Sequence, residues 1–346
     1  MPAQRIDIEQ FLSLALLHPV LDVRSPGEFK HAHIPGAVSF PLFTDEERKI
    51  VGTTYKQKSR EDAIKIGLDF FGPTLKQRVQ DAERIANGSK ILLVHCWRGG
   101  MRSAAISWLL DLFGFKIYTL SGGYKAYRNW VLAQFKKDYP FQLIGGYTGS
   151  GKTELLNQVK KERQQVIDLE ALAGHKGSAF GNIGLPPQPG QEQFENKLAQ
   201  ALQNCVQTNQ TASIWLEDES QRIGTVNIPN ELWATMRKSP VYFLDIPFEK
   251  RLEHIVEEYG QLDRDAVIAA IVRITKKLGH QQAQQSIDLF QENNTTASFA
   301  ILLRYYDKFY ARSLQNREGL EKLLIAIPSN QTGAGNVGAL LEVKKI

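Results

Sequence analysis

Cysteine and long apolar runs are scarce in this chain of 346 residues. Its two cysteines, Cys96 and Cys205, are too few for a disulfide framework at this length. That excludes a disulfide-stapled scaffold and predicts a reducing, cytoplasmic setting. No run approaches the roughly 20 apolar residues that a membrane-spanning helix needs. The N-terminal segment lacks an apolar signal-peptide core, so we expect neither a membrane span nor a signal peptide.

A strong excess of charge is also lacking. The net charge is +5, with 42% hydrophobic and 23% charged residues, which is ordinary for a globular protein. The mild basic excess is compatible with a polyanionic partner without identifying one. The length predicts about two domains.

A conspicuous cysteine lies in the segment 95–103, where two glycines and two arginines follow it. The apolar run 91–94 before it predicts a buried strand, and the pattern of 104–110 predicts a helix. Backbone N–H groups at a helix N-terminus and nearby arginines stabilise a thiolate, which is the nucleophilic form of cysteine. We therefore predict a catalytic site made of Cys96, Arg98 and Arg102.

Motifs upstream and downstream of this cysteine resemble those of a rhodanese domain. They fall in the expected order over roughly residues 5–130: Asp22 to Arg24, Glu28 and Phe29, His33 to Ala37, the Cys96 loop, and Leu120 to Gly123. The resemblance implies a parallel α/β domain and a persulfide-type or related chalcogen-transfer cysteine. We expect Asp22 and Arg24 to form a structural ion pair and His95 to be a satisfied residue at the strand end.

The cysteine loop departs from the rhodanese pattern in its length. Five residues separate Cys96 from Arg102, one more than in a common rhodanese loop. That length resembles the phosphatase relatives of the fold, whose loop cradles a phosphate. A longer loop also gives room for a bulkier substrate, so both interpretations stay open on this stretch. Trp97 fits either stacking on a base or packing.

A phosphate-binding pattern opens the second half of the chain. A short strand at 141–144 runs into the motif G-x-x-x-x-G-K-[ST], and a helix follows from 154. In this context the glycines let backbone N–H groups wrap a diphosphate, the lysine neutralises its charge, and the threonine is placed to hold Mg²⁺. The predicted diphosphate-binding residues are Gly146, Gly149, Ser150, Gly151, Lys152 and Thr153.

Two further loops are predicted to face the same ligand. The strand predicted at 165–170 and the strand at 213–216 both end in acids, so we expect Thr153 with Asp168 or Glu217 to hold Mg²⁺. A glycine-rich basic loop follows the strand predicted at 165–170, and we predict that this loop contacts the substrate. Its candidate residues are His175, Lys176 and Ser178.

Strands alternate with helices throughout, which predicts an α/β fold with two parallel sheets. We place a rhodanese-like domain at 1–135 and a P-loop domain with a helical C-terminal part at 136–346. On the helix 296–315 the aromatic and basic residues fit packing better than nucleic-acid binding. The tail beyond Asn330 is expected to be loosely held.

The pairing of these two domains resembles the tRNA 2-selenouridine synthase family over nearly the whole chain. The matching segments are the Cys96 loop, 145–153, 168–181 and 217–224. The resemblance implies a transferase that replaces sulfur by selenium in the 2-thiouridine of the tRNA wobble position. It also implies selenophosphate as donor, an S-geranyl-2-thiouridine intermediate made from geranyl diphosphate, and the tRNA anticodon arm as partner.

The two motifs suggest how this chemistry is divided. A P-loop binds a diphosphate, so we expect Lys152 and Thr153 to hold geranyl diphosphate and Cys96 to act in the replacement of the alkylated sulfur. Two alternatives remain: a P-loop ATPase or kinase fused to a persulfide-carrying sulfurtransferase, and a phosphatase-like regulatory module. The sequence gives neither the oligomeric state nor the particular tRNAs.

Overall fold

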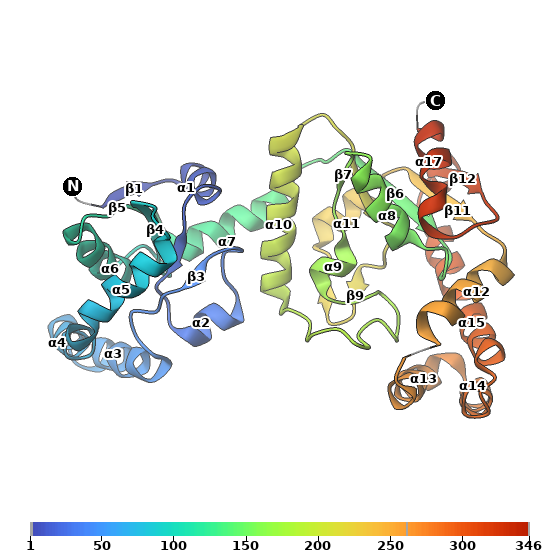
Figure 1. Ribbon diagram of the computed structural model, residues 1–346, viewed down its shortest axis with the longest axis horizontal. Helices are drawn as coiled ribbons and strands as arrows, with labels where there is room; N and C mark the ends of the chain where they lie inside the picture. Colours follow the sequence, from blue (N-terminus) through green and yellow to red (C-terminus); the bar gives the residue numbers. More distant parts are fainter. Residues whose placement is uncertain (1–2, 261, 345–346) are drawn as a thin grey trace. The chain divides into compact units, whose positions relative to one another are not determined.

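The computed structural model describes residues 3–260 and 262–344. The chain divides into two compact units, Met1–Gln134 and Phe135–Ile346, and each is built around a five-stranded sheet (Figure 1). Every strand pairing within these two sheets is parallel. The predicted α/β class with two parallel sheets is therefore confirmed.

The sheet of the first unit has β4 at its centre. In order across the sheet its strands are β1 (Gln4–Ile6), β5 (Lys116–Leu120), β4 (Ile91–His95), β2 (Val20–Asp22) and β3 (Val38–Ser39). Its helices are α1 (Ile8–Ala15), α2 (Pro26–His31), α3 (Asp45–Gln57), α4 (Arg60–Phe71), α5 (Leu75–Ala86), α6 (Met101–Leu112) and α7 (Gly123–Gln134), with a 3₁₀ turn η1 at Gly72–Thr74. Because the apolar run of β4 lies between two strands, it delivers Cys96 from the middle of the sheet.

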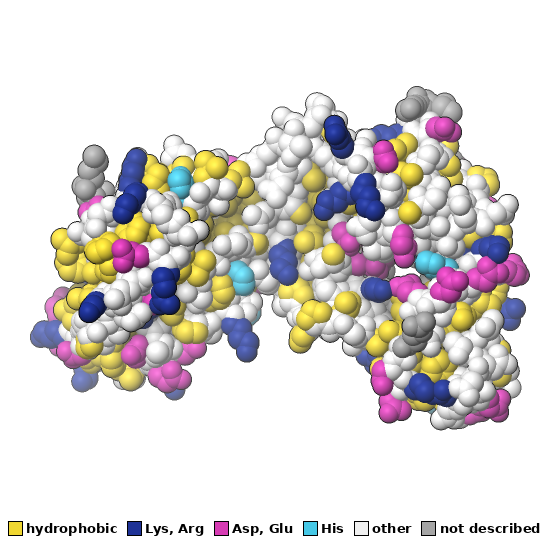
Figure 2. Space-filling model, in the orientation of Figure 1, with side chains coloured by type: hydrophobic (Ala, Val, Ile, Leu, Met, Phe, Trp, Pro, Cys, Tyr) yellow, Lys and Arg dark blue, Asp and Glu magenta, His cyan; other side chains and the backbone are white. Residues whose placement is uncertain are grey.

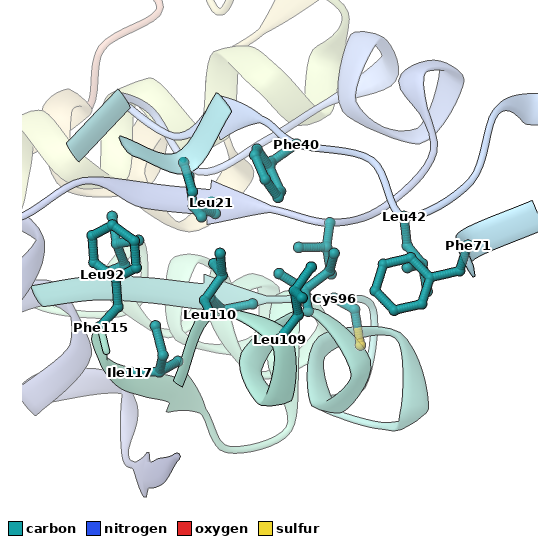
Figure 3. Close-up of a cluster of buried hydrophobic side chains, with 14 of the residues drawn as sticks. Leu21, Phe40, Leu42, Phe71, Leu92, Cys96, Leu109, Leu110, Phe115 and Ile117 are labelled. Carbon is teal, nitrogen blue, oxygen red and sulfur yellow. The ribbon is translucent and has the colours of Figure 1, made fainter. Parts of the chain in front are cut away.

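Cys96 is part of the hydrophobic core of this unit. Leu92 and Val94 of β4 are fully buried among side chains from β2, β5 and α6. Cys96 belongs to the same cluster, on the side of Leu42 and Phe71 (Figure 3). The thiol therefore sits at the boundary between a packed core and the loop that leads into α6.

Two helices, α3 and α4, lie between β3 and β4 in the chain and pack on each other. The start of α3 is fixed by a capping box, in which Thr44 N–H donates to Glu47 Oε2 at 2.8 Å and Thr44 Oγ1 accepts from the Glu47 N–H. Ser59 caps α4 by accepting from the Asp62 N–H at 3.0 Å. These caps set where both helices begin beside the cysteine loop.

The second unit has β6 at the centre of its sheet. In order its strands are β12 (Leu324–Pro328), β11 (Val241–Asp245), β6 (Phe141–Gly146), β8 (Ile214–Glu217) and β7 (Gln165–Val166), and β9 (Arg222–Ile223) and β10 (Val226–Asn227) form a small antiparallel hairpin. Its helices are α8 (Lys152–Lys161), α9 (Leu169–Ala173), α10 (Gln191–Thr208), α11 (Asn230–Arg237), α12 (Phe248–Tyr259), α13 (Arg264–Leu278), α14 (His280–Gln291), α15 (Thr295–Gln315), α16 (Leu320–Leu323) and α17 (Val337–Val343), with a 3₁₀ turn η2 at Gly333–Asn336.

The predicted helical part is present as α12 to α15 (Figure 1). These helices share a second apolar cluster. The packing predicted for the aromatic residues of α15 is confirmed for Tyr305, which packs against that cluster beside Tyr306. Tyr310 lies instead at the P-loop, where its hydroxyl accepts a hydrogen bond from the Gly146 N–H. Among the described residues, the helices include none that is both long and apolar enough to cross a bilayer.

Two local predictions were wrong. The strand predicted over 165–170 ends at Val166, because Asp168 caps α9 by accepting from the Ala171 N–H at 2.7 Å. The tail is not loose: η2 and α17 pack on α8, and Leu340 is fully buried beside Leu155 and Trp215. The sequence did not predict this last helix, because its apolar pattern is short and follows several glycines.

Candidate active sites

The loop after β4 wraps the sulfur of Cys96 in hydrogen-bond donors. The Gly100 N–H donates to Sγ at 3.3 Å, and Ser103 Oγ lies 3.3 Å from it. Gly99 adopts a φ of +66°, and a Cβ there would lie 2.8 Å from the Leu120 carbonyl oxygen. The turn therefore requires glycine at this position, and it aims the start of α6 at the thiol.

These contacts favour the anionic form of the cysteine. Burial alone would raise the pKa of the Cys96 thiol, since its side chain is only 3% exposed. The hydrogen bonds from Ser103 and from the backbone of Arg98 and Gly100 outweigh that effect and hold the pKa below its ordinary value. Cys205 is the opposite case, because burial raises the pKa of its thiol.

The two predicted arginines differ in their surroundings. Arg98 is exposed and lines a cavity of about 700 Å³ that also contains Cys96 and Arg102. Arg102 Nη1 is 2.6 Å from Glu28 Oε2, so a carboxylate already holds its guanidinium. This ion pair, to which Arg48 adds a contact at 3.6 Å, keeps the pKa of the half-buried Glu28 low despite the opposing effect of burial.

A buried ionic group supports the loop from below. Arg24 Nη2 is 2.6 Å from Asp22 Oδ2 and 2.7 Å from the Ala32 carbonyl oxygen, which confirms the predicted ion pair. The guanidinium also lies over the Tyr124 ring, 3.7 Å from its centroid. His95 is fully buried 3.7 Å from Asp22, and its ring nitrogens lack hydrogen bonds within the described chain. The prediction of a satisfied histidine was wrong in that respect, and burial lowers its pKa.

The P-loop lies between β6 and α8, as its motif predicts. Gly151 precedes α8 with a φ of +72°, and a Cβ there would lie 2.4 Å from the Gly333 nitrogen. Ser150 Oγ donates to the Tyr147 carbonyl at 2.7 Å, and Lys152 Nζ donates to the Gly146 carbonyl at 3.2 Å. The Gly333 N–H donates to the Ser150 carbonyl at 3.1 Å, so the C-terminal tail helps to fix the loop.

Buried carboxyl groups face the threonine of the P-loop. Thr153 Oγ1 lies 2.7 Å from Glu217 Oε1 and 3.2 Å from Glu170 Oε2. Burial, together with the neighbouring carboxylates, raises the pKa of Glu217 and of Glu170. Burial also raises the pKa of Glu219. The surroundings of the cluster therefore favour the protonated form of these carboxyl groups.

The donor set of this cluster suits a hard divalent cation. One oxygen from each of Glu170, Glu217 and Glu219 lies within 4.8 Å of the others, and buried Glu217 Oε2 lacks a hydrogen-bond partner among the described residues. Carboxylate and hydroxyl oxygens are the ligands that Mg²⁺ prefers. Glu217 and Thr153 thus fit the predicted role, whereas Asp168 does not join the set because its carboxylate caps α9.

These groups line a cavity of about 490 Å³ with two kinds of wall. One wall carries the P-loop and the acids. The other is contributed by α12 and α15 and is largely aromatic or aliphatic, with Ile255, Tyr259, Tyr306, Phe309, Tyr310 and Leu314. Tyr310 joins the two walls, since its hydroxyl donates to Asp218 Oδ2 at 2.9 Å and accepts from the Gly146 N–H at 3.1 Å.

The predicted substrate loop contributes two of its three residues to this cavity. Lys176 and Ser178 line it, and Lys176 Nζ is 2.5 Å from Glu258 Oε1. His175 does not line the cavity. Its side chain is buried and its pKa is lowered by that burial, so its role toward a ligand stays a prediction.

Comparisons with known proteins cover both units. Residues 7–129 match the model of the rhodanese-like domain, and residues 139–324 match that of the tRNA 2-selenouridine synthase AAA domain. A tRNA 2-selenouridine synthase of Nitrosomonas europaea is 35% identical, covering 86% of this chain and 90% of its own length. The chain belongs to the tRNA 2-selenouridine synthase family. Relatives of the same name from Marinobacter nauticus and Shewanella denitrificans are 34% and 33% identical, each covering 92% of this chain and 94% of the relative.

For this member of the tRNA 2-selenouridine synthase family, the structure groups the predicted residues at two separate sites. Cys96, Arg98 and Arg102 line one cavity, and Gly149, Gly151, Lys152 and Thr153 line the other with Glu217. Gly146 and Ser150 do not line the cavity, and instead make hydrogen bonds that fix the P-loop. Sequence reasoning missed Glu28, Ser103, Glu170, Glu219 and Tyr310. Of these, Glu170 and Glu219 had a clear signal, because Glu170 ends the segment 165–170 that was predicted as a strand and Glu219 follows Glu217 after another predicted strand.

Proposed function

We propose that the enzyme replaces the sulfur of 2-thiouridine at the tRNA wobble position by selenium, in two steps on two sites. The observation that carries this proposal is the presence of two distinct cavities, one around an activated cysteine and one around a P-loop. The family relationship supports tRNA as the substrate. We further propose that the enzyme works in the cytoplasm, in keeping with its two free thiols.

The P-loop cavity suits geranyl diphosphate. Lys152 and the glycines of the P-loop line it and would hold a diphosphate through the lysine charge and backbone N–H groups. The apolar side chains of α12 and α15 on the other wall would contact a prenyl chain. In this step the sulfur of 2-thiouridine attacks the first carbon of the chain. A C–S bond forms, the C–O bond to diphosphate breaks, and the N3 proton of the base is lost to solvent. Lys152 stabilises the leaving diphosphate.

The acidic side chains of this cavity suggest that a cation binds there together with the diphosphate. Six carboxyl groups line it, from Glu154, Glu170, Glu217, Asp218, Glu219 and Glu258. A diphosphate would meet repulsion there unless the acids stayed protonated or held a divalent ion. Mg²⁺ held by Thr153, Glu170, Glu217 and Glu219 would supply positive charge to the diphosphate oxygens.

The Cys96 cavity suits the second step. Here the selenium of selenophosphate replaces sulfur at C2: the C2–Se bond forms, the C2–S bond breaks, and geranylthiol leaves with a proton. Water then cleaves the Se–P bond and releases phosphate. The exposed Arg98 lines this cavity and would hold the selenophosphate anion, and Arg102 is held by Glu28 at the same cavity. We assign Cys96 to this exchange as the activated thiolate.

Mass analysis of tRNA nucleosides tests the proposal. Wild-type enzyme is incubated with 2-thiouridine tRNA and selenophosphate, with and without geranyl diphosphate. We expect 2-selenouridine only when both co-substrates are present, and S-geranyl-2-thiouridine when selenophosphate is left out. Selenouridine at equal yield without geranyl diphosphate would contradict the two-step route. In a parallel incubation to which ATP is added, ATP hydrolysis without any nucleoside product would favour the P-loop ATPase alternative.

A further inference from the structure

The cavity at Cys96 extends well beyond the space that a phosphate-sized anion needs. Its volume is about 700 Å³, and its far walls come from α3 and α4. We call this part, lined by Val51, Tyr55, Ile64, Leu68 and Met101 together with Trp97, the apolar groove. The groove begins at the catalytic loop, because Trp97 directly follows Cys96 and Met101 opens α6.

Charge and hydrophobicity are separated within this cavity. The basic side chains that line it are Arg48, Lys49, Lys56, Arg98 and Arg102, and an acidic side chain is lacking among the described lining residues. The apolar groove leaves large side chains in contact with water: Leu68 is 59% exposed and Met101 48%. The space-filling view shows hydrophobic side chains interrupting the polar surface of this unit (Figure 2). Such a surface is stabilised when an apolar ligand covers it.

The proposed second step brings such a ligand to the thiol. The prenyl chain is bonded to the sulfur that is replaced, so it enters the cavity with the nucleoside. The basic side chains complement the phosphates of the RNA and of the selenium donor. The apolar groove is then the part of the cavity that suits the hydrocarbon, and cavities of this size commonly enclose an apolar ligand.

We infer that the apolar groove between α3, α4 and the Cys96 loop is a subsite for the prenyl chain of the alkylated nucleoside and for the prenyl thiol that leaves. This inference rests on the proposed function. It assigns the helices inserted between β3 and β4 a role in substrate selection, since they supply the groove's walls. The subsite makes the enzyme select the alkylated nucleoside over the unmodified one.

Binding of two short RNAs tests the subsite. Anticodon stem–loops carrying S-geranyl-2-thiouridine or S-methyl-2-thiouridine are titrated with the full-length enzyme, and dissociation constants are measured by fluorescence anisotropy. We expect wild-type enzyme to bind the geranyl RNA about tenfold or more tightly than the methyl RNA, because several additional methylene groups leave water. Leu68→Asp should abolish that preference, because it should weaken binding of the geranyl RNA much more than binding of the methyl RNA.

The matched control is Leu112→Asp. Leu112 is 71% exposed at the end of α6 and does not line the cavity, so this variant should keep the full preference. Leu68→Ala should lose part of the preference, which guards against a folding defect caused by the aspartate. A preference retained in Leu68→Asp would overturn the inference, as would equal weakening of both RNAs, which would assign the groove to the RNA itself.

A separate reaction distinguishes failure of the subsite from failure of the proposed function. Wild-type enzyme is given the geranyl RNA and selenophosphate. If 2-selenouridine forms and yet wild-type enzyme binds the two RNAs equally, the subsite is wrong and the two-step route stands. If the geranyl RNA yields no 2-selenouridine, the route itself is wrong.

Discussion

The reactivity of Cys96 is a balance between burial and hydrogen bonding. The side chain is nearly inaccessible, which by itself would disfavour a thiolate, yet donors from two loop residues and from Ser103 in the first turn of α6 reverse the effect. A cysteine with such surroundings is expected to react at lower pH than a free thiol, whose pKa is about 8.5. Ser103 is the only side chain among these donors, so it is the residue to change.

Replacing Ser103 by alanine should make Cys96 less acidic. A hydrogen bond to a charged group contributes about 1.5 kcal/mol or more, so the pH midpoint of alkylation should rise by roughly one pH unit. Iodoacetamide labelling across a pH series, read by mass spectrometry of the Cys96 peptide, measures that midpoint. The Cys205 peptide is the internal control, since its thiol lies in the other unit. An unchanged midpoint would mean that the backbone donors suffice.

The buried acid Glu217 makes stability depend on pH. Burial beside Glu219 and Asp168 raises its pKa in the folded protein above the ordinary value of 4.5. The folded state thus keeps a proton that the unfolded state has lost, so this group costs stability as the pH rises above about 4.5. Glutamine cannot ionise but keeps an oxygen for the hydroxyl of Thr153.

We therefore expect Glu217→Gln to raise the melting temperature of the metal-free protein by a few degrees near pH 8 and by less near pH 5. Mg²⁺ should raise the melting temperature of wild-type enzyme more near pH 8 than near pH 6, because the cation displaces protons, and should have little effect on the variant. Scanning calorimetry with and without Mg²⁺ measures both effects. A variant that Mg²⁺ stabilises as much as wild type would remove Glu217 from the cation site.

At the scale of elements, the sequence predicts the strands better than it predicts the segments that follow them and the side-chain contacts between distant segments. The apolar runs at β4, β6 and β8 are visible because strands buried on both faces need them. The strand predicted over the segment after β7 was wrong. Asp168 followed by Leu169–Ala173, which is rich in helix formers, is a pattern typical of a capped helix N-terminus. The contacts of Glu170 and Tyr310 could not be predicted, because they join segments that are 17 and 164 residues from their P-loop partners.

The final helix offers a stability test at this scale. Leu340 of α17 is fully buried against α8 and β8 side chains, so Leu340→Ala should lower the free energy of unfolding of this unit by about 3 kcal/mol. Leu185→Ala is the control, since that side chain is 39% exposed in the same unit and should change stability by less than about 0.5 kcal/mol. Urea denaturation measures both variants. Equal midpoints would restore the expectation of a loosely held tail.

The whole molecule carries a modest positive charge of +5, and basic side chains gather at the Cys96 cavity. Binding of tRNA should therefore weaken as salt displaces these contacts. We expect a loss of about a hundredfold between roughly 50 and 200 mM salt, which corresponds to about four neutralised phosphates. Filter binding across a salt series measures the slope. A loss smaller than about threefold would indicate recognition without phosphate contacts.

The central claim is that the two units perform different steps of one modification. The most direct test follows the nucleosides made by Cys96→Ser and Lys152→Ala enzymes when both co-substrates are present. Cys96→Ser should accumulate S-geranyl-2-thiouridine without selenouridine. Lys152→Ala should make neither product from 2-thiouridine tRNA, and yet it should selenate tRNA that is already geranylated. Loss of both steps in Cys96→Ser, or accumulation of geranylated tRNA by Lys152→Ala, would contradict this division.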